Sequence, residues 1–340
     1  MIARATSQST SGRCRSRSSF TLVELLMVIA IIGLLASSIM FAMWNVMEDT
    51  KRSRTESQIA RINALLMEKY ESYQTRAVPI KVPPGTPPRA AAIMRLNAIR
   101  ELMRMEMPDR ITDVTDPARV LSSAPSSWRT YRRQSVATWS DTNQGAECLY
   151  LILRNMRDAD TSALDFFNEN EVGDVDGDGM LEILDGWGKP IDFLRWAPGF
   201  SEMPGPDGGW GVTGVDDDGD GVTDNSTEAA WPGSDDIASP SLLQTRNVHV
   251  APDPFDPLRL DSRWTDPTPG NEPFALYPLI FSAGEDGIYD IATDNKTGGP
   301  FRAWASFNDP YASLADGTLP GAIMDQGAID NVSNHMSTVP

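Results

Sequence analysis

The sequence has little cysteine and little histidine, and these shortages exclude several classes of protein. Two cysteines, Cys14 and Cys148, among 340 residues cannot form a disulfide-rich scaffold or a cysteine-based zinc cluster. The two histidines, His249 and His335, offer little material for His-ligated metals or His-dependent catalysis. Basic residues are also outnumbered: 29 Lys and Arg stand against 47 Asp and Glu, a net charge of −18. Because such a chain repels phosphate backbones, we expect no nucleic-acid partner.

The charge is distributed unevenly along the chain. Residues 1–19 contain four arginines and no acidic residue, so the remainder carries 25 basic and 47 acidic side chains. The next segment, residues 20–44, has one charged side chain, Glu24. As a helix this segment would extend roughly 37 Å, which is enough to cross a bilayer core of about 30 Å. We therefore expect one membrane-spanning helix, with the arginine-rich end cytoplasmic and everything after residue 44 outside.

Glu24 is the unusual side chain of this apolar segment. A carboxylate inside a membrane is costly unless it is paired, so Glu24 is a candidate functional residue. The alternative is a simple signal anchor whose glutamate reaches the membrane interface. An ordinary secretory signal peptide fits less well, because its apolar region is shorter and ends at a small-residue cleavage site.

The residues around Glu24 resemble the class III signal of type IV pilins and type II secretion pseudopilins. The resemblance rests on SSFTLVELL, residues 18–26. It implies that a prepilin peptidase cuts between Ser19 and Phe20 and methylates the new amino terminus, while the apolar helix stays on the mature protein. Glu24 would then pair with the terminal ammonium of a neighbouring subunit and set the register of assembly. The family nearly always has glycine before the cut, where this chain has Ser19.

The expected fold is α+β and pilin-like, with a long N-terminal helix packed on a small antiparallel sheet and with large helical and loop insertions. Residues 20–76 contain no proline and a single glycine, which favours one continuous helix. We divide it into a transmembrane part, residues 20–44, and a periplasmic continuation, residues 45–76. The continuation has one apolar face, which fits either packing on a domain or a plain coiled-coil stalk. That face consists of Ile59, Ile62, Leu66, Tyr70 and Tyr73.

Prolines end this helix, and a region of insertions follows. Five prolines lie within residues 79–88, and apolar residues within 92–103 then return to helical spacing. We expect the methionines of this second helix to pack against other helices. A basic cluster at residues 128–133 is expected in a solvated loop. Residues 77–145 are therefore assigned to helical and loop insertions.

We expect residues 1–19 to be a cleaved basic leader. We expect residues 146–340 to form a pseudopilin-like globular region. Residues 145–156 predict a short buried helix that contains Cys148. Removal of the leader would take Cys14 away, so we expect Cys148 to be a small core residue without a disulfide.

An Asp/Gly-rich segment carries much of the negative charge. Residues 171–224 contain 14 acidic and two basic side chains. Within it, DVDGDGMLEILD at residues 174–185 follows the spacing of an EF-hand-type calcium loop, in which alternating carboxylates converge on one hard cation. The alternative is a turn stabilised by Asx hydrogen bonds alone. The candidate ligands are Asp174, Asp176, Asp178, the carbonyl of Met180, Glu182 and Asp185.

A second Asp-rich run, residues 216–224, repeats the same alternation. It resembles the aspartate repeats of thrombospondin type 3 modules, but Thr227 occupies the position of the last carboxylate. Its candidate ligands are Asp216, Asp218, Asp220 and Asp224. Many carboxylates on a short segment repel one another without a cation, so structural Ca²⁺ is the expected cofactor.

Two further segments resemble type II secretion major pseudopilins, and both also read as short strands bounded by glycine. DGWGKPIDF at residues 185–193 is similar to the segment that begins their sheet, and YPLIFSAGEDGIYD at residues 277–290 is similar to the following strand and calcium loop. The resemblance implies that Asp286 and Asp290 bind Ca²⁺, with Asp294 as a further candidate ligand, and that Trp187 anchors the core. The chain is longer than a usual major pseudopilin, so its rank as a major or minor subunit stays open.

These features favour a structural protein: a pseudopilin-like subunit of a type II secretion or related pilus filament. The implied partners are other pilin or pseudopilin subunits, the inner-membrane assembly platform, the prepilin peptidase and the lipid bilayer. The implied location is the inner (plasma) membrane, crossed once, with the C-terminal domain periplasmic or extracellular. One alternative is a minor, tip-located pilin that binds a secreted substrate or a surface. Another is a membrane-anchored hydrolase, but the sequence has no nucleophile elbow, phosphate loop or HExxH motif, so we expect no enzyme activity.

Overall fold

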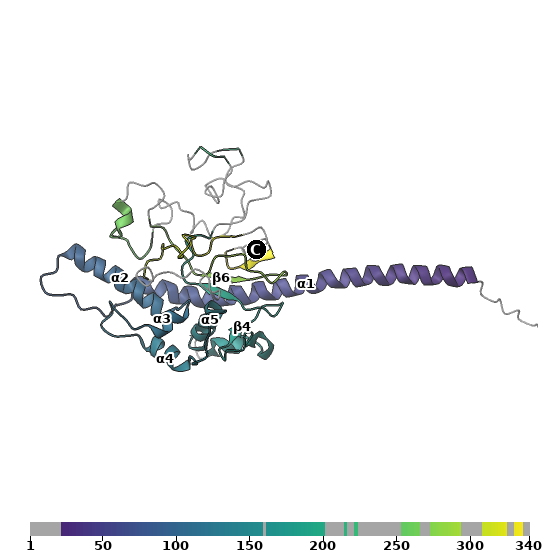
Figure 1. Cartoon of the computed structure of the whole chain (residues 1–340), viewed down its shortest axis with the longest axis horizontal. Helices are drawn as coiled ribbons and strands as arrows, with labels where there is room; N and C mark the ends of the chain where they lie inside the picture. Colours follow the sequence, from purple (N-terminus) through teal and green to yellow (C-terminus); the bar gives the residue numbers. More distant parts are fainter. Residues whose placement is uncertain are drawn as a thin grey trace, which may run out of the picture. The chain divides into compact units, whose positions relative to one another are not determined.

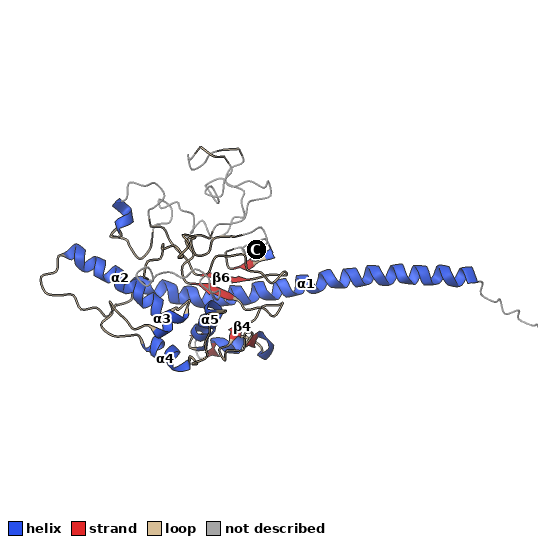
Figure 2. Cartoon of the chain, in the orientation of Figure 1, coloured by secondary structure: helices blue, strands red, loops and turns tan. Residues whose placement is uncertain are grey.

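The computed structural model describes residues 22–158, 161–200, 214–215, 221–223, 253–265, 273–293, 308–324 and 330–335. The chain divides into two compact units, Met1–Asp49 and Thr50–Pro340. Figure 2 shows a long helix, shorter helices and very short strands. The combination of helices with small antiparallel sheets confirms the α+β prediction.

Helix α1 (Leu22–Thr75) is the longest element, with 54 residues (Figure 1). At 1.5 Å per residue it extends roughly 80 Å, and it ends one residue before the predicted boundary because prolines follow. In the first unit, the large apolar side chains whose burial is described are exposed, from 45% for Val28 to 78% for Leu22. Among the described residues, no helix is both long enough and apolar enough to cross a membrane. The structure therefore does not confirm the membrane span predicted at residues 20–44.

The second half of α1 packs into the core of the second unit. The predicted apolar face is buried there, with Ile59, Ile62 and Leu66 at 0% exposure and Tyr70 and Tyr73 at 1%. The Tyr70 hydroxyl donates a 2.5 Å hydrogen bond to the carbonyl of Leu276, far along the chain. The amphipathic prediction is confirmed, and the partner of the apolar face is this chain's own domain.

Among the described residues, the second unit contains four more α-helices. In Figure 1, α3, α4 and α5 lie on one side of the second half of α1, and the C-terminal segments lie on the other side. The second predicted helix and the short buried helix around Cys148 are both present, and Cys148 is a buried free thiol. The helices are α2 (Pro88–Glu106), α3 (Ile111–Thr115), α4 (Ser126–Gln134) and α5 (Gln144–Arg154).

Helix α4 corrects the expectation of a solvated loop at residues 128–133. Trp128 and Tyr131, three residues apart, are buried on one face of the helix, while the arginines between and after them are exposed. The Trp128 indole donates to the carbonyl of Asp113, and the Tyr131 hydroxyl donates to the carbonyl of Glu106. Two aromatic anchors with buried polar ends therefore hold a short helix in a stretch that is basic overall.

The main sheet has three antiparallel strands in the order β5-β6-β7. Phe193 of β5 lies opposite Ile280 of β6, and Ser282 of β6 lies opposite Val332 of β7. Strands β5 and β6 fall in the two segments predicted to be strands, whereas β7 was not predicted. The strands are β5 (Asp192–Leu194), β6 (Leu279–Ser282) and β7 (Val332–Ser333).

Two smaller hairpins and three 3-10 helices complete the described elements. Strands β3 and β4 form the hairpin that carries the first Asp-rich loop. The hairpins pair β1 (Arg157–Asp158) with β2 (Thr161–Ser162) and β3 (Val172–Gly173) with β4 (Glu182–Ile183). The 3-10 helices are η1 (Ala163–Phe166), η2 (Glu169–Glu171) and η4 (Ser262–Thr265).

The segment after β4 packs directly against α1. A Cβ atom on Gly186 would lie 2.5 Å from the carbonyl oxygen of Lys51, so only glycine fits there. The Gly186 amide also donates to the hydroxyl of Thr55 at 2.9 Å. The neighbouring Trp187 is only partly buried at the edge of the core, whereas Trp196 is 2% exposed. Among the described tryptophans, Trp128 and Trp196 are buried in the core, whereas Trp187 only packs against its edge.

A buried network of ion pairs joins α2, α3 and the end of β5. Arg195 has no exposed surface, and its Nη1 and Nη2 lie 2.8 Å from Asp113 Oδ2 and 3.4 Å from Asp109 Oδ1. Arg104, also fully buried, lies 3.6 Å from Asp113 and 3.7 Å from Glu101. Charges this deep require partners, because the cost of leaving one of them unpaired is several kcal/mol.

Candidate functional site

The residues predicted to act in processing and assembly lie at the start of the chain. Ser19 and Phe20 are outside the described residues. Glu24 lies in the first turn of α1, on an exposed position of the first unit. A carboxylate in the first turn of a helix interacts favourably with the positive end of the helix dipole.

The first Asp-rich loop is the connection of the β3–β4 hairpin. Gly173 of β3 lies opposite Glu182 of β4, so the two ends of the loop are held together. Gly177 and Gly179 adopt φ values of 78° and 98°, a left-handed conformation that glycine adopts without strain. The hairpin and its glycines therefore fold residues 174–181 into a tight turn.

The aspartates of this loop accept backbone hydrogen bonds within the turn. The two carboxylate oxygens of Asp174 accept from Gly177 and Gly179 at 2.7 and 3.0 Å. Asp178 accepts from the amide of Met180 at 2.8 Å, and Asp176 accepts from the amide of Asp178 at 3.3 Å. The Asx alternative is thus realised in the structure. It does not exclude a cation, because each carboxylate oxygen keeps further acceptor capacity.

The segment before α5 covers one side of the loop. The amide of Ser140 donates to Asp178 at 2.5 Å, and its hydroxyl donates to Asp176 at 3.3 Å. The hydroxyl of Thr138 donates to the backbone carbonyl of Asp178. Two sections of chain that are about forty residues apart are therefore joined at Asp176 and Asp178.

Glu147 of α5 approaches the same carboxylates. Glu147, Asp176 and Asp178 each offer one oxygen such that the three atoms lie within 4.8 Å of one another. Within the described ranges, no other group of three or more acidic, His or Cys side chains is close enough to hold one ion. Burial raises the pKa of Glu147 to about 9. Burial likewise raises the pKa of Glu182, which is fully buried, to about 7.

The remaining predicted ligands of this loop have other surroundings. Glu182 accepts a hydrogen bond from the amide of Val175 at 3.2 Å. Met180 is 3% exposed and its side chain belongs to the main core. Asp185 accepts from the amides of Trp187 and Lys189 and from the hydroxyl of Ser282, which ties it to β6. Asp185, the twelfth position of the predicted calcium loop, therefore accepts hydrogen bonds from within the protein that hold its own turn and join it to β6.

The other two predicted calcium loops are described only in part. Asp216, Asp218, Asp220 and Asp224 lie outside the described residues, as does Asp294.

In the loop after β6, Asp286 accepts a 2.8 Å hydrogen bond from the amide of Ile288, and its own amide donates to Asp330 Oδ2 at 2.9 Å. Asp290 has a left-handed backbone, with φ 48°. Its carbonyl accepts from the amide of Met324. The sequence did not predict that Asp330 lies beside this loop. Its carboxylate contacts the loop from a segment more than forty residues away along the chain.

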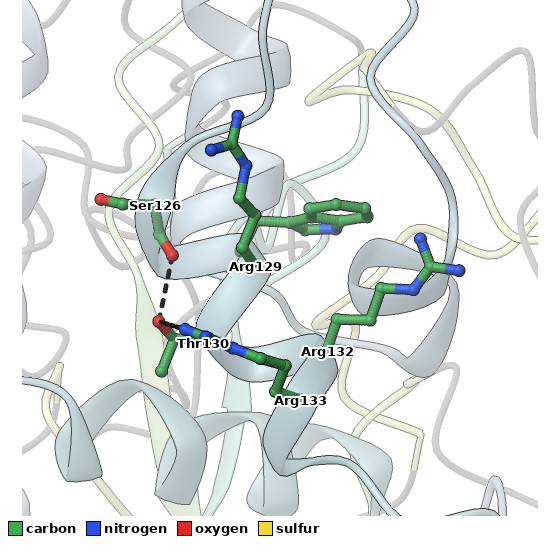
Figure 3. Close-up of a pocket in the computed structure, with 6 residues that line it drawn as sticks. Ser126, Arg129, Thr130, Arg132 and Arg133 are labelled. Atoms are coloured by element: carbon green, nitrogen blue, oxygen red, sulfur yellow. Dashed lines mark hydrogen bonds between the residues drawn. The ribbon is translucent and has the colours of Figure 1, made fainter.

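Helix α4 presents a basic surface on this acidic protein. Arg129, Arg132 and Arg133 extend from the helix around an open hollow of about 680 Å³ (Figure 3). The Arg132 guanidinium lies over the Trp128 ring, 5.3 Å from its centroid, and Arg133 donates to the Thr130 hydroxyl. Among the described residues, none of these three arginines forms an ion pair with a carboxylate. We refer to these three side chains as the arginine surface.

Comparison with known families identifies the N-terminal segment. The family described as the prokaryotic N-terminal methylation motif matches residues 14–40, a stretch that includes Ser19, Phe20 and Glu24. The match confirms the resemblance inferred from residues 18–26. No curated protein and no solved structure matches the chain.

Proposed function

We propose, from the premise that this chain carries the N-terminal methylation motif of type IV pilin-like subunits, that it is a pseudopilin-like structural subunit of a type II secretion or related pilus filament. The motif match at residues 14–40 carries the proposal. The protein would then act by assembling with other subunits into a filament, and we propose no enzymatic activity for it.

The proposed assembly uses the first unit. A prepilin peptidase would remove residues 1–19 and methylate Phe20. Residues 20–44 would anchor the protein in the inner membrane, with the second unit periplasmic or extracellular, until the assembly platform transfers it to neighbouring subunits. The apolar side chains exposed along the first half of α1 support this role, because surfaces of this kind mark protein or membrane contacts. Glu24 would pair with the ammonium of a neighbouring Phe20, which neutralises both charges.

The N terminus of the mature protein tests this proposal. Mass spectrometry of the protein from a host with a prepilin peptidase should find an N-methylated Phe20. An intact Met1, or a cut after residue 41, would remove the protein from this class.

Replacement of Glu24 by Gln tests the assembly step. We expect incorporation into filaments to fall on the order of tenfold or more, since the partner ammonium loses its counter-charge. Glu71→Gln, at an exposed position on the same helix, is the matched control and should assemble normally. Equal incorporation of Glu24→Gln and wild type would refute the role of Glu24.

We also propose that Ca²⁺ is a structural cofactor of the second unit. The supporting observations are the alternating aspartates on a tight hairpin turn and their convergence with Glu147. Only oxygen ligands are present, which suits a hard cation. The ion would supply no reaction; it would offset the mutual repulsion of the carboxylates and make the loop rigid.

A second candidate function is that of a minor, tip-located pilin that binds a secreted substrate or a surface. The arginine surface favours it, because exposed arginines without carboxylate partners in the described structure are suited to an acidic partner. The two candidates differ in stoichiometry. A copy number near that of the main filament protein would exclude a tip location.

A further inference from the structure

Glu147 is an acidic residue at a buried position of helix α5, followed by the apolar run from Cys148 to Leu153. It lies in the first turn of α5 and has no exposed surface. Its Oε2 accepts a hydrogen bond from the indole of Trp139, whereas its Oε1 has no hydrogen-bond partner. An unpaired carboxylate oxygen at such a position is costly, so its presence requires an explanation.

The neighbours of Glu147 provide that explanation. Oxygens of Glu147, Asp176 and Asp178 lie within 4.8 Å of one another, although no positively charged side chain joins them in any described ion pair. Calcium binds oxygens at about 2.3–2.6 Å, so two oxygens on one ion are separated by about 5 Å at most. The three carboxylates are thus already spaced for a shared ion.

We propose that Glu147 is a ligand of the calcium ion in the first Asp-rich loop, so that the ion ties this loop to helix α5. The inference rests on the proposed calcium binding and adds a ligand that no loop motif contains. Asp176 and Asp178 supply the other carboxylates. Among the carboxylate groups of this region, those of Glu147 and Glu182 come from fully buried positions.

The position of α5 gives the ion a structural consequence. Helix α5 packs against both β4 and β5, and its apolar residues belong to the main core. The segment that leads into α5 already contacts the loop through Thr138 and Ser140. An ion held by Glu147 therefore connects the exposed loop to the core of the second unit.

The first test compares thermal unfolding of the full chain in detergent, with calcium and with chelator. Wild type should show a higher Tm with calcium. Glu147→Gln preserves the shape of the side chain but removes its charge, so the calcium-dependent rise should be lost or calcium affinity should fall roughly tenfold. In chelator, Glu147→Gln should be about as stable as wild type, because the glutamine amide has nearly the shape of the buried carboxyl group that it replaces.

Glu171→Gln is the matched control. Glu171 is a buried carboxylate just before β3, but its partners are Arg54, Gln58 and Asn168. This variant should lower Tm equally in calcium and chelator and leave the calcium-dependent rise unchanged.

The second test uses Tb³⁺ in place of calcium. Because the Trp139 indole contacts Glu147 directly, excitation of Trp139 should sensitise the emission of Tb³⁺ bound there. Trp139→Phe should abolish most of this emission while retaining the calcium-dependent rise in Tm, and excess calcium should quench the emission of wild type.

The outcomes separate this inference from the calcium proposal. If Asp176→Asn with Asp178→Asn abolishes the rise in Tm but Glu147→Gln leaves it intact, calcium binds and Glu147 is not a ligand. If wild type shows no rise, the calcium proposal and this inference both fail, while the N-terminal assignment to an assembling subunit stands on its own test.

Discussion

His335, near the C terminus, is a buried titratable side chain outside the candidate sites. It is 5% exposed, and its ring packs against that of Phe200, with 5.4 Å between centroids. Burial lowers the pKa of His335 to about 4. The imidazole is therefore neutral in the folded protein at neutral pH, whereas in the unfolded chain it would gain a proton near pH 6.5.

This difference predicts a loss of stability in mild acid. As the pH falls through the window from about 6.5 to about 4, the unfolded state takes up the proton and the folded state does not. Between about pH 7 and about pH 5, His335 should cost about 2 kcal/mol of unfolding free energy. Urea unfolding at both pH values should show a smaller drop for His335→Gln than for wild type. Parallel losses would contradict the low pKa of His335.

The elements differ in how far the sequence predicted them. The second half of α1 could be predicted, because its apolar face repeats at helical spacing and its end is marked by prolines. Helix α4 could not, because its two aromatic anchors are outnumbered by polar and basic residues. Their buried positions depend on carbonyl groups of Glu106 and Asp113, which only the tertiary structure brings near.

The buried ion pairs at the junction of α2, α3 and β5 should contribute to the stability of the second unit. Arg195→Met should destabilise the second unit by about 3 kcal/mol, because Asp109 and Asp113 would lose a partner while remaining buried. Chemical unfolding would measure the change. Arg129→Met, on the arginine surface, is the control and should change stability by less than about 0.5 kcal/mol. A loss for Arg195→Met as small as that of the control would show that the network contributes little.

Across the whole molecule, the charge separates into regions with different roles. Residues 1–19 are basic, residues 20–44 contain one acidic residue, and the rest is strongly acidic. Over half of that negative charge lies within residues 171–224, which include the loop that meets Glu147. Like charges at this density destabilise a compact state.

Salt should therefore stabilise the protein by screening its charges and calcium by binding to a site, and the two effects should differ in the concentration that they require. In chelator, raising the NaCl concentration should raise Tm gradually, since screening weakens the repulsion between exposed carboxylates. Calcium should raise Tm further at concentrations that barely change the ionic strength, because it binds a defined set of ligands. Magnesium at the same concentration is the control. Equal effects of magnesium and calcium would indicate screening without a selective site.

The sequence by itself determined the N-terminal methylation motif and the main helical pattern. The methylation motif, the spacing of Glu24 from Phe20, the long helix and the aspartate alternation are local patterns, so they can be recognised without knowledge of the fold. The tertiary structure alone decided which carboxylates meet. It placed Glu147 beside Asp176 and Asp178, and directed Asp185 to Ser282, because hairpin pairing and helix packing join residues far apart in the chain. In the sequence, only the isolated glutamate in the apolar part of α5 indicated that a polar contact lies there. The spacing of residues could not identify Asp176 and Asp178 as its neighbours.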